Sequence, residues 1–406
     1  YAGLSGNKSL LDKTTVLRFF DRVRAFFDHT IANNRRTDGL YHAYNLIRFK
    51  DAGIGIEHLH EMLEGQVAVL SSGYLGPKDS LALLQNLRDS AIYRPDQNSY
   101  MLYPDREQVH FLDRNVIPES LLGANAWIGR ELSAQQVGII ERDAEGGVHF
   151  HGDLRNANDL AAALRRRPDI SAGDATAIGD VYEAVFRHRR FTGRSGSMFK
   201  YEGLGCIYWH MVSKLLLATA EVIDGAMASG TDEHTLNGLL ERYDDIKDGI
   251  GLHKTPAEYG AFTTDAYSHT PGFNGVQQPG MTGQVKEDII ARFIELGVRV
   301  ADGHVAFSPN MLRREEFLAE AASRANPAGD QIAGAELAAG CLAFTVCGVP
   351  VIYRLAEAYS VNVEDGDGAV HTFEGNRLGA DWSRSLFRRE GRIRKIEVDV
   401  PGDELR

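Results

Sequence analysis

The sequence predicts a mainly α-helical protein, a toroid of (α/α) helical hairpins that is followed by a small antiparallel β-domain at the C-terminus. Over residues 1–330, apolar residues recur with the 3.6-residue period of amphipathic helices, and the connecting loops alternate between short and long. After about residue 335, apolar residues come in short β-branched or aromatic runs instead. We therefore expect two domains, a barrel region over residues 1–330 and a β-domain over residues 335–406.

The helical pattern is clearest near the start of the chain. Over residues 10–30, Val16, Phe20, Val23 and Phe27 recur at helical spacing. Further helices are expected over residues 57–70, 78–87, 156–166, 177–187, 204–228, 232–247 and 285–296. Strand-like runs between these segments are scarce, which disfavours a parallel α/β fold.

The C-terminal region has the pattern of short strands. The runs that predict strands are residues 342–353, 360–363, 370–374, 385–387 and 393–400. The acidic, glycine-rich residues 364–368 are expected to turn between two of these strands. An Asp302-Gly303 turn predicts a hairpin over residues 298–307, where the two domains meet.

The composition excludes several classes of function. The chain of 406 residues is 43% hydrophobic and 25% charged, as globular proteins usually are. Its net charge of −12 argues against nucleic-acid and anionic-membrane partners, which attract basic surfaces. Cys206, Cys341 and Cys347 lack metal-site spacing and predict reduced thiols in the cytoplasm. The apolar stretch 333–355 contains glycine, proline and glutamate, which predicts a buried helix followed by a strand rather than a membrane span.

A long polar loop over residues 253–288 is the most informative segment. A compact domain rarely keeps such a segment unless it builds a binding site. Its Asp265, Tyr267, Gln277 and Gln278 side chains are candidates for binding a substrate. The loop ends in Thr282-Gly283 and runs directly into an amphipathic helix, so these two residues are expected to bind an anion at the helix N-terminus.

Asp38 is the second candidate for a functional site. It lies in the sequence Arg35-Arg36-Thr37-Asp38-Gly39-Leu40-Tyr41, directly after the first helix. An Asp-Gly pair at the end of a helix is most often only a turn. Here Tyr41 and Asn45 follow it, and an aromatic ring and an amide are suited to stacking on a sugar and hydrogen-bonding to it.

A glycine-rich loop over residues 196–205 is the third candidate, because glycine lets the backbone approach a ligand closely. Lys200 and Glu202 lie in this loop, and His210 follows in the next helix. For His210 the alternative is a histidine satisfied within the core, and both readings stay open. His149 and His151 alternate along a segment that we expect to be a surface hairpin, and no metal site is expected.

Taken in order, these blocks resemble the cellobiose-phosphorylase family of inverting glycoside phosphorylases. The family's Asp-Gly-Met-Asn motif is matched by Asp38-Gly39-Leu40. Its Glu-Asn-Gly-Gly…His block resembles residues 202–205 with His210, and its Thr-Gly turn resembles Thr282-Gly283. The Trp-Asn that precedes the general acid in the family is replaced here by Arg36-Thr37. Such divergence suggests a distant branch, such as the 1,2-β-oligoglucan phosphorylases.

The resemblance implies an (α/α)6 toroid that cleaves β-linked gluco-oligosaccharides with inorganic phosphate and releases α-glucose 1-phosphate. Asp38 would be the general acid, Glu202 would bind the sugar, and His210, Thr282 and Gly283 would bind phosphate. The other candidates for binding the oligosaccharide are Tyr41, Asn45, Lys200, Asp265, Tyr267, Gln277 and Gln278. No cofactor is implied, because phosphate is the co-substrate.

The family's N-terminal β-domain and first barrel helices have no counterpart before Tyr1. We therefore expect the barrel to be incomplete at its N-terminus and the missing part to belong to the same polypeptide. A homodimer stays open. Two alternative functions remain, an inverting glycoside hydrolase on the same fold, which would need a second carboxylate as base, and a non-catalytic carbohydrate-binding fragment.

Overall fold

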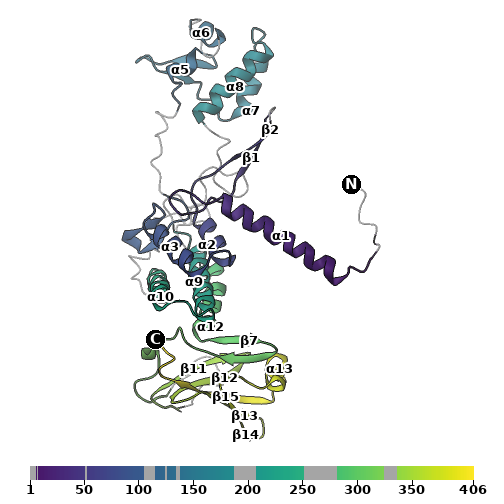
Figure 1. The fold of residues 1–406 in the computed structure, drawn as a ribbon. Helices are drawn as coiled ribbons and strands as arrows, with labels where there is room; N and C mark the ends of the chain where they lie inside the picture. Colours follow the sequence, from purple (N-terminus) through teal and green to yellow (C-terminus); the bar gives the residue numbers. More distant parts are fainter. Residues whose placement is uncertain are drawn as a thin grey trace.

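The computed structural model describes residue 6 and residues 8–50, 53–104, 115–123, 126–133, 138–186, 207–250, 281–323 and 336–406. Within these residues the chain packs around three hydrophobic cores. The first lies among the helices of residues 63–88, 209–248 and 281–295. The second lies within residues 117–186, and the third lies in the C-terminal sheet. Figure 1 shows the helical layers joined to the C-terminal sheet through α12 and β7.

Helical hairpins build the first core. Its helices are α2 (Leu63–Ser71), α3 (Pro77–Arg88), α9 (Trp209–Ala228), α10 (Glu233–Asp248) and α12 (Met281–Glu295). Short loops join α2 to α3 and α9 to α10, so each pair is an antiparallel hairpin. The helix α9 packs against α2, α10 and α12, and α3 packs against α10.

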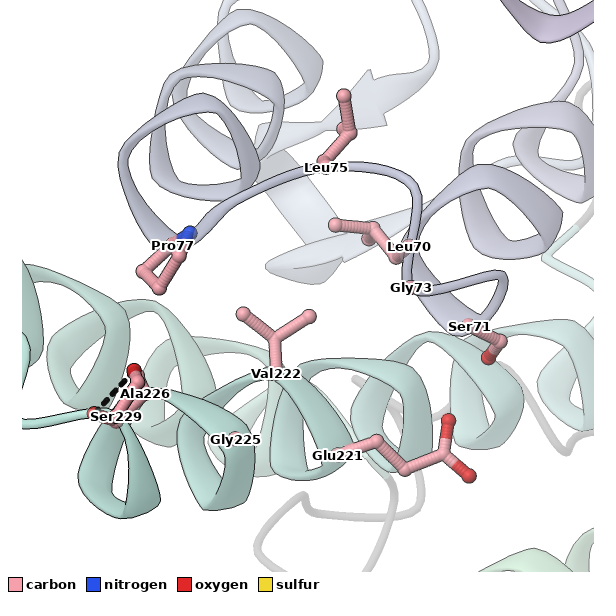
Figure 2. A pocket seen from close by; sticks show the side chains of 10 residues that line it. All are labelled: Leu70, Ser71, Gly73, Leu75, Pro77, Glu221, Val222, Gly225, Ala226 and Ser229. Atoms are coloured by element: carbon pink, nitrogen blue, oxygen red, sulfur yellow. Dashed lines mark hydrogen bonds between the residues drawn. The ribbon is translucent and has the colours of Figure 1, made fainter. Parts of the chain in front are cut away.

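The helices α2 and α9 run in the same direction. At their starts, Met101 forms a β-bridge with Ile207 just before α9, and the Leu63 N–H at the start of α2 donates to the Leu102 carbonyl at 3.0 Å. Their C-terminal halves line one cavity of 330 Å³, which Figure 2 shows from close by. The N-terminal ends of α2 and α9 therefore lie at one end of the helical layer.

The helix α12 is parallel to these two. Near the start of α9, His210 contacts Glu287 in the first half of α12. At the other end, Asp224 of α9 pairs with Arg299, just beyond the end of α12. A layer of parallel helices with antiparallel partners alongside is the arrangement that (α/α) toroids repeat. The described residues form no closed ring, so the complete toroid stays a prediction.

Two N-terminal elements leave apolar side chains in solvent. The helix α1 (Lys13–Asn33) is the amphipathic helix that the sequence predicts, and Asp12 caps it by accepting from the Thr15 N–H at 2.9 Å. None of its residues is buried. The strands β1 (Leu46–Lys50) and β2 (Gly53–Glu57) form an antiparallel hairpin that the sequence analysis did not predict, and the helix expected from residue 57 begins only at Leu63.

Residues 115–186 contain the second core. Its elements are α5 (Glu119–Leu122), α6 (Ala126–Ser133), β5 (Ile140–Arg142), β6 (Val148–Phe150), α7 (Ala157–Arg165) and α8 (Ala172–Phe186). The strands β5 and β6 pair as the hairpin that was expected around His149. Trp127, Phe150 and Tyr182 are the large side chains of this core.

The C-terminal domain is a five-stranded sheet in the order β11-β12-β15-β13-β14. Its strands are β11 (Cys341–Val346), β12 (Val349–Ala356), β13 (Ser360–Asp365), β14 (Val370–Glu374) and β15 (Ile393–Pro401). The pairing of β12 with β15 is parallel and the other pairings are antiparallel, so the sheet is mixed where an antiparallel one was expected. The long connection from residue 357 to residue 392 permits this parallel pair.

Before the sheet, β7 (Val298–Ala301) and β8 (His304–Phe307) confirm the hairpin predicted at Asp302-Gly303. Two strand predictions in the sheet were wrong in detail. Residues 342–353 form two strands, because Cys347 and Gly348 turn the chain with φ angles of 54° and 85°. Residues 385–387 belong to α13 (Ala380–Arg388), whose Trp382 and Leu386 are buried in the third core. A three-residue window shows the apolar residues but not this helical period.

Shorter elements complete the described chain. They are β3 (Tyr93–Arg94), η1 (Pro95–Gln97), β4 (Ser99–Tyr100), η3 (Arg314–Glu316), β9 (Ala322–Ser323) and β10 (Glu336–Leu337). In the part of the apolar stretch 333–355 that the structure describes, the elements are strands rather than a helix. None of the described helices is both long enough and apolar enough to cross a membrane.

Candidate functional site

A tight turn after α1 presents the side chain of Asp38. The Arg36 N–H donates to the Leu40 carbonyl at 2.8 Å, and the His42 N–H donates to the Asn34 carbonyl at 2.8 Å. At the tip, Gly39 has a φ of +80°, and a Cβ placed there would lie 2.2 Å from Asn86 Nδ2. The left-handed backbone angle therefore favours glycine at this position, and a larger residue would also require the Asn86 side chain to move.

Asp38 is held as a carboxylate by Arg36. The guanidinium donates from Nε at 3.1 and 3.0 Å and from Nη2 at 2.7 Å, and the Leu40 N–H also donates to Oδ1 at 3.1 Å. The hydrogen bonds from Arg36 lower the pKa of Asp38. A general acid needs the opposite shift, because it must be protonated near neutral pH. The Asp38 side chain is 45% exposed, so a ligand can reach it.

A second carboxylate shares the same guanidinium. Arg36 Nη1 lies 3.3 Å from Glu61 Oε2, in the segment just before α2. Glu61 and Arg36 are both about three-quarters covered, with side chains 23% and 21% exposed. The Asp38 turn is thus connected to the start of α2 by an ion pair that the sequence analysis did not identify.

Polar side chains line the same turn. Asn45 donates from Nδ2 to Asn34 Oδ1 at 2.7 Å, and its Oδ1 lies 2.8 Å from His58 Nδ1. The rings of His58 and His42 stack with centroids 4.1 Å apart. Burial lowers the pKa of His42, so this ring favours its neutral form. Asn45, a predicted substrate-binding residue, is therefore already bound to two side chains here.

Tyr41 occupies a different position from the one expected of a sugar-binding residue. Its N–H donates to Gln66 Oε1 at 2.9 Å, and its carbonyl accepts from Gln66 Nε2 at 2.9 Å. Tyr41 is 3% exposed and belongs to the helical core. The residue fixes the Asp38 turn to the first turn of α2, while its ring is covered by protein. Trp209, at the start of α9, is buried in the same core.

His210 lies in the first turn of α9 and faces α12. Its Nε2 is 3.1 Å from Glu287 Oε1, and its Nδ1 is 3.5 Å from the Tyr208 hydroxyl. Its side chain is 22% exposed, whereas that of Glu287 is 3% exposed. His210 is thus neither free in solvent nor fully enclosed in the core.

Glu287 is a buried carboxylate that stays ionised. Burial acts to raise its pKa, but the contacts from His210 and Lys286 outweigh burial, and the net shift is downward. One of its oxygens, Oε2, is buried and accepts no hydrogen bond among the described residues. Burial also raises the pKa of its neighbour Asp288. Acidic groups therefore gather where α12 meets α9, and any anion bound there must lie beyond them, towards the helix start.

Thr282 and Gly283 are in the first turn of α12, which begins at Met281, one residue before the predicted Thr-Gly turn. The first four N–H groups of a helix lack intrahelical acceptors and face outward along the axis. Glu287 follows Thr282 by about 7.5 Å along that axis, at 1.5 Å per residue. His210, which contacts Glu287, therefore lies close to the N-terminal turn of α12.

The Asp38 turn and His210 lie at the same end of the helical layer. Tyr41 fixes the turn to the first helical turn of α2, and His210 is in the first helical turn of α9. The starts of α2 and α9 are adjacent, as the pairing of Met101 with Ile207 shows. The expectation that Asp38, Glu202, His210 and Thr282 share one pocket is not tested, because Glu202 lies outside the described residues.

Several predicted site residues fall outside the described part of the chain. They are Lys200, Glu202, Asp265, Tyr267, Gln277 and Gln278. Conversely, sequence reasoning missed Arg36, Glu61, Gln66 and Glu287. Only Arg36 had a signal, since a cation two residues before a carboxylate in a turn can reach it. Glu61, Gln66 and Glu287 belong to other elements, and no local sequence pattern connects them to the site.

The cavity of Figure 2 lies away from these residues. Val222 of α9 faces Leu70 and Pro77 across it. Val222 is about 18 Å from His210 along the axis of α9, at 1.5 Å per residue. The residues that line the cavity are mostly apolar. They are Leu70, Ser71, Gly73, Leu75, Pro77, Glu221, Val222, Gly225, Ala226 and Ser229. This cavity holds none of the predicted catalytic residues.

The histidines of the β5–β6 hairpin are paired with carboxylates. His149 Nε2 lies 2.6 Å from Asp143 Oδ2, and His151 Nε2 lies 3.5 Å from Glu141 Oε1. Across the residues that the structure describes, no group of three or more His, Cys, Asp or Glu side chains is placed to hold a metal ion.

Comparison with known families bears on residues 115–186. Residues 108–189 match the family model described as GH149 phosphorylase insertion domain 2. The matched range contains the whole second core. No curated protein matches the chain. The match supports a glycoside phosphorylase of the GH149 type. The cellobiose-phosphorylase family and the 1,2-β-oligoglucan branch are not confirmed by it.

Proposed function

We propose that the chain carries the active site of an inverting glycoside phosphorylase, which cleaves β-linked gluco-oligosaccharides with inorganic phosphate and releases α-glucose 1-phosphate. The observation that carries this proposal is the match of residues 108–189 to a phosphorylase insertion domain. The position of the Asp38 turn and of His210 at one end of parallel helices is consistent with it.

The proposed reaction needs one carboxylic acid and one anion site. Asp38 protonates the departing glycosidic oxygen, and phosphate attacks the anomeric carbon from the opposite face, where an inverting hydrolase would place a base and a water. The bond from the anomeric carbon to the glycosidic oxygen breaks as the bond to a phosphate oxygen forms. Asp38 is left as a carboxylate. Phosphate needs no activation by a second carboxylate, because it is already an anion.

The start of α12 is the proposed phosphate site. The Thr282 and Gly283 N–H groups and the helix dipole favour an anion at this position. A carboxylate only accepts hydrogen bonds, so the contact with Glu287 places a proton on Nε2 of His210. The ring then binds phosphate through Nδ1, and it donates there only when it is protonated. Lys200, Glu202, Asp265, Tyr267, Gln277 and Gln278 stay predictions for the sugar subsites.

One observation favours a second candidate function. Arg36 keeps Asp38 ionised, which is the form that a general base needs. An inverting glycoside hydrolase on the same fold would use an ionised carboxylate to activate water. The two functions differ in their need for phosphate.

The deciding experiment incubates the full-length protein with β-gluco-oligosaccharides of each linkage, with and without inorganic phosphate. A phosphorylase releases α-glucose 1-phosphate only when phosphate is present, and arsenate in its place gives net hydrolysis. Sugar release that is indifferent to both anions would contradict the phosphorylase and support the hydrolase.

A further inference from the structure

Arg36 is placed between two carboxylates of different elements. It binds Asp38, two residues later in the same turn, through Nε and Nη2, with a shortest distance of 2.7 Å. Its third nitrogen, Nη1, lies 3.3 Å from Glu61 in the segment before α2. A rotation of the guanidinium away from Asp38 would therefore leave its charge paired with Glu61.

The pairing with Asp38 conflicts with the role proposed for that residue. A cation in bidentate contact stabilises the carboxylate, typically by one to three pKa units. A proton donor must instead hold its proton until the glycosidic oxygen is in place. The conflict disappears if Arg36 leaves Asp38 during the catalytic cycle.

We propose that Arg36 is a positioning residue that controls the protonation of Asp38, and that Glu61 retains the guanidinium when Arg36 leaves Asp38. This inference rests on the proposed function. With Arg36 on Glu61, Asp38 takes up a proton from solvent and passes it to the glycosidic oxygen as the bond to the anomeric carbon breaks. Asp38 is then a carboxylate again, and Arg36 returns to it.

The other ionisable groups around the turn do not duplicate this effect. His42 interacts electrostatically with both Asp38 and Arg36, and its ring is stacked on that of His58. Burial lowers the pKa of His42, so it carries little charge near neutral pH. The only other carboxylate in contact with Arg36 among the described residues is that of Glu61. The control of Asp38 is thus assigned to the Arg36 and Glu61 pair.

The test is the dependence of kcat for phosphorolysis on pH in Arg36→Gln, Glu61→Gln and the double variant. The reaction needs protonated Asp38, so the rate falls as pH rises through the pKa of Asp38 in the enzyme–substrate complex. Arg36→Gln should move the midpoint of this fall upward by about one unit or more. Glu61→Gln should move it downward, because Arg36 then stays on Asp38. The double variant should behave like Arg36→Gln, because Glu61 acts only through Arg36.

Arg94→Gln is the matched control. Arg94 pairs with Asp96, which is also two residues later, and its Nε lies 2.9 Å from Oδ1. The Arg94→Gln substitution should leave the pH profile unchanged. Thermal unfolding checks that each variant folds. If Arg36→Gln does not fold, Glu61→Gln carries the test alone. If the variants release glucose 1-phosphate and their pH midpoints equal that of the wild type, the inference is wrong and the proposed function stands. The absence of phosphate-dependent release from the wild type would overturn both.

Discussion

His210 at the start of α9 contacts Glu287 of α12 through Nε2 and Oε1, which lie 3.1 Å apart across 77 positions of the chain. The carboxylate is almost fully buried, and the histidine remains partly open to solvent. The contact fixes the orientation of the imidazole ring, and it joins the two helices whose N-terminal ends form the proposed phosphate site.

Glu287→Gln should raise the KM for phosphate about 10- to 150-fold and change kcat little. A neutral amide cannot form the charge-assisted hydrogen bond that the Glu287 carboxylate forms with Nε2–H of His210, and such bonds contribute about 1.5–3 kcal/mol. His210→Ala should act in the same direction. Initial rates over a range of phosphate concentrations measure the effect. Lys286→Ala is the control, because Lys286 is mostly exposed and its contact with Glu287 should contribute little. If Lys286→Ala raised the KM for phosphate as much as Glu287→Gln does, the contact between His210 and Glu287 would have no specific role.

Asp38→Asn should lower the rate by about 10²–10⁴-fold, the usual contribution of general acid catalysis. Substrate binding should survive, because the amide has nearly the same shape. The change also removes a half-exposed ion pair, which costs at most about 1 kcal/mol, so thermal unfolding should shift little. Asp96→Asn removes the matched acid of the Arg94 pair and should leave the rate unchanged. Near-normal activity of Asp38→Asn would exclude Asp38 as the proton donor.

Gly39→Ala should destabilise the protein by about 1–3 kcal/mol, because it combines a left-handed backbone angle with a clash against Asn86. Adding Asn86→Ala should recover part of the loss, because it removes the clash and leaves the backbone term of about 1 kcal/mol. Denaturant unfolding of the two single variants and the double variant measures the coupling. Strictly additive effects would mean that the close approach of Gly39 to Asn86 has no energetic weight.

Glu295 is expected to stabilise the junction of α10 and α12. It is 3% exposed and accepts hydrogen bonds from Tyr243 at 2.6 Å, from Lys247 at 2.6 Å and from Arg292 at 2.5 Å. Glu295→Ala leaves a buried hydroxyl and two cations without this acceptor, so it should cost about 3–5 kcal/mol in denaturant unfolding. A loss below about 1 kcal/mol would show that water replaces the carboxylate.

The ionisation of Glu295 should also make the stability of the protein depend on pH. Burial acts to raise the pKa of Glu295, but Lys247, Tyr243 and Arg292 outweigh it and lower the pKa in the folded state. A carboxyl group whose pKa is lowered on folding contributes its stability above the unfolded value and loses it as pH falls through the folded one. Wild type should therefore lose more stability than Glu295→Gln as pH falls below about 4.5, the value for the unfolded group. Parallel curves for the two proteins would contradict this.

Local patterns in the sequence were sufficient for most of the helices. The period of α10 and its Asp232 cap, which accepts from the Thr235 N–H at 3.0 Å, both depend on residues a few positions apart. The hairpin at Asp302-Gly303 is local in the same way. The predictions that were wrong or missing concern short segments. Residues 385–387 show two apolar side chains and not the helical period of α13. The hairpin of β1 and β2 did have a local signal that the sequence analysis did not use, because Ile47, Phe49, Ile54 and Ile56 alternate with other residues.

The sequence by itself determined that Asp38 lies in a glycine turn after a helix, that His210 lies within another helix, and that Thr282 and Gly283 lie at the N-terminal end of a third. Only the tertiary structure decided that Tyr41 is buried, that Glu287 binds His210, and that Asp38 is held ionised by an arginine shared with Glu61. The physical reason is that turns and helix ends arise from neighbouring residues, whereas burial and charge depend on segments that packing brings together from distant parts of the chain.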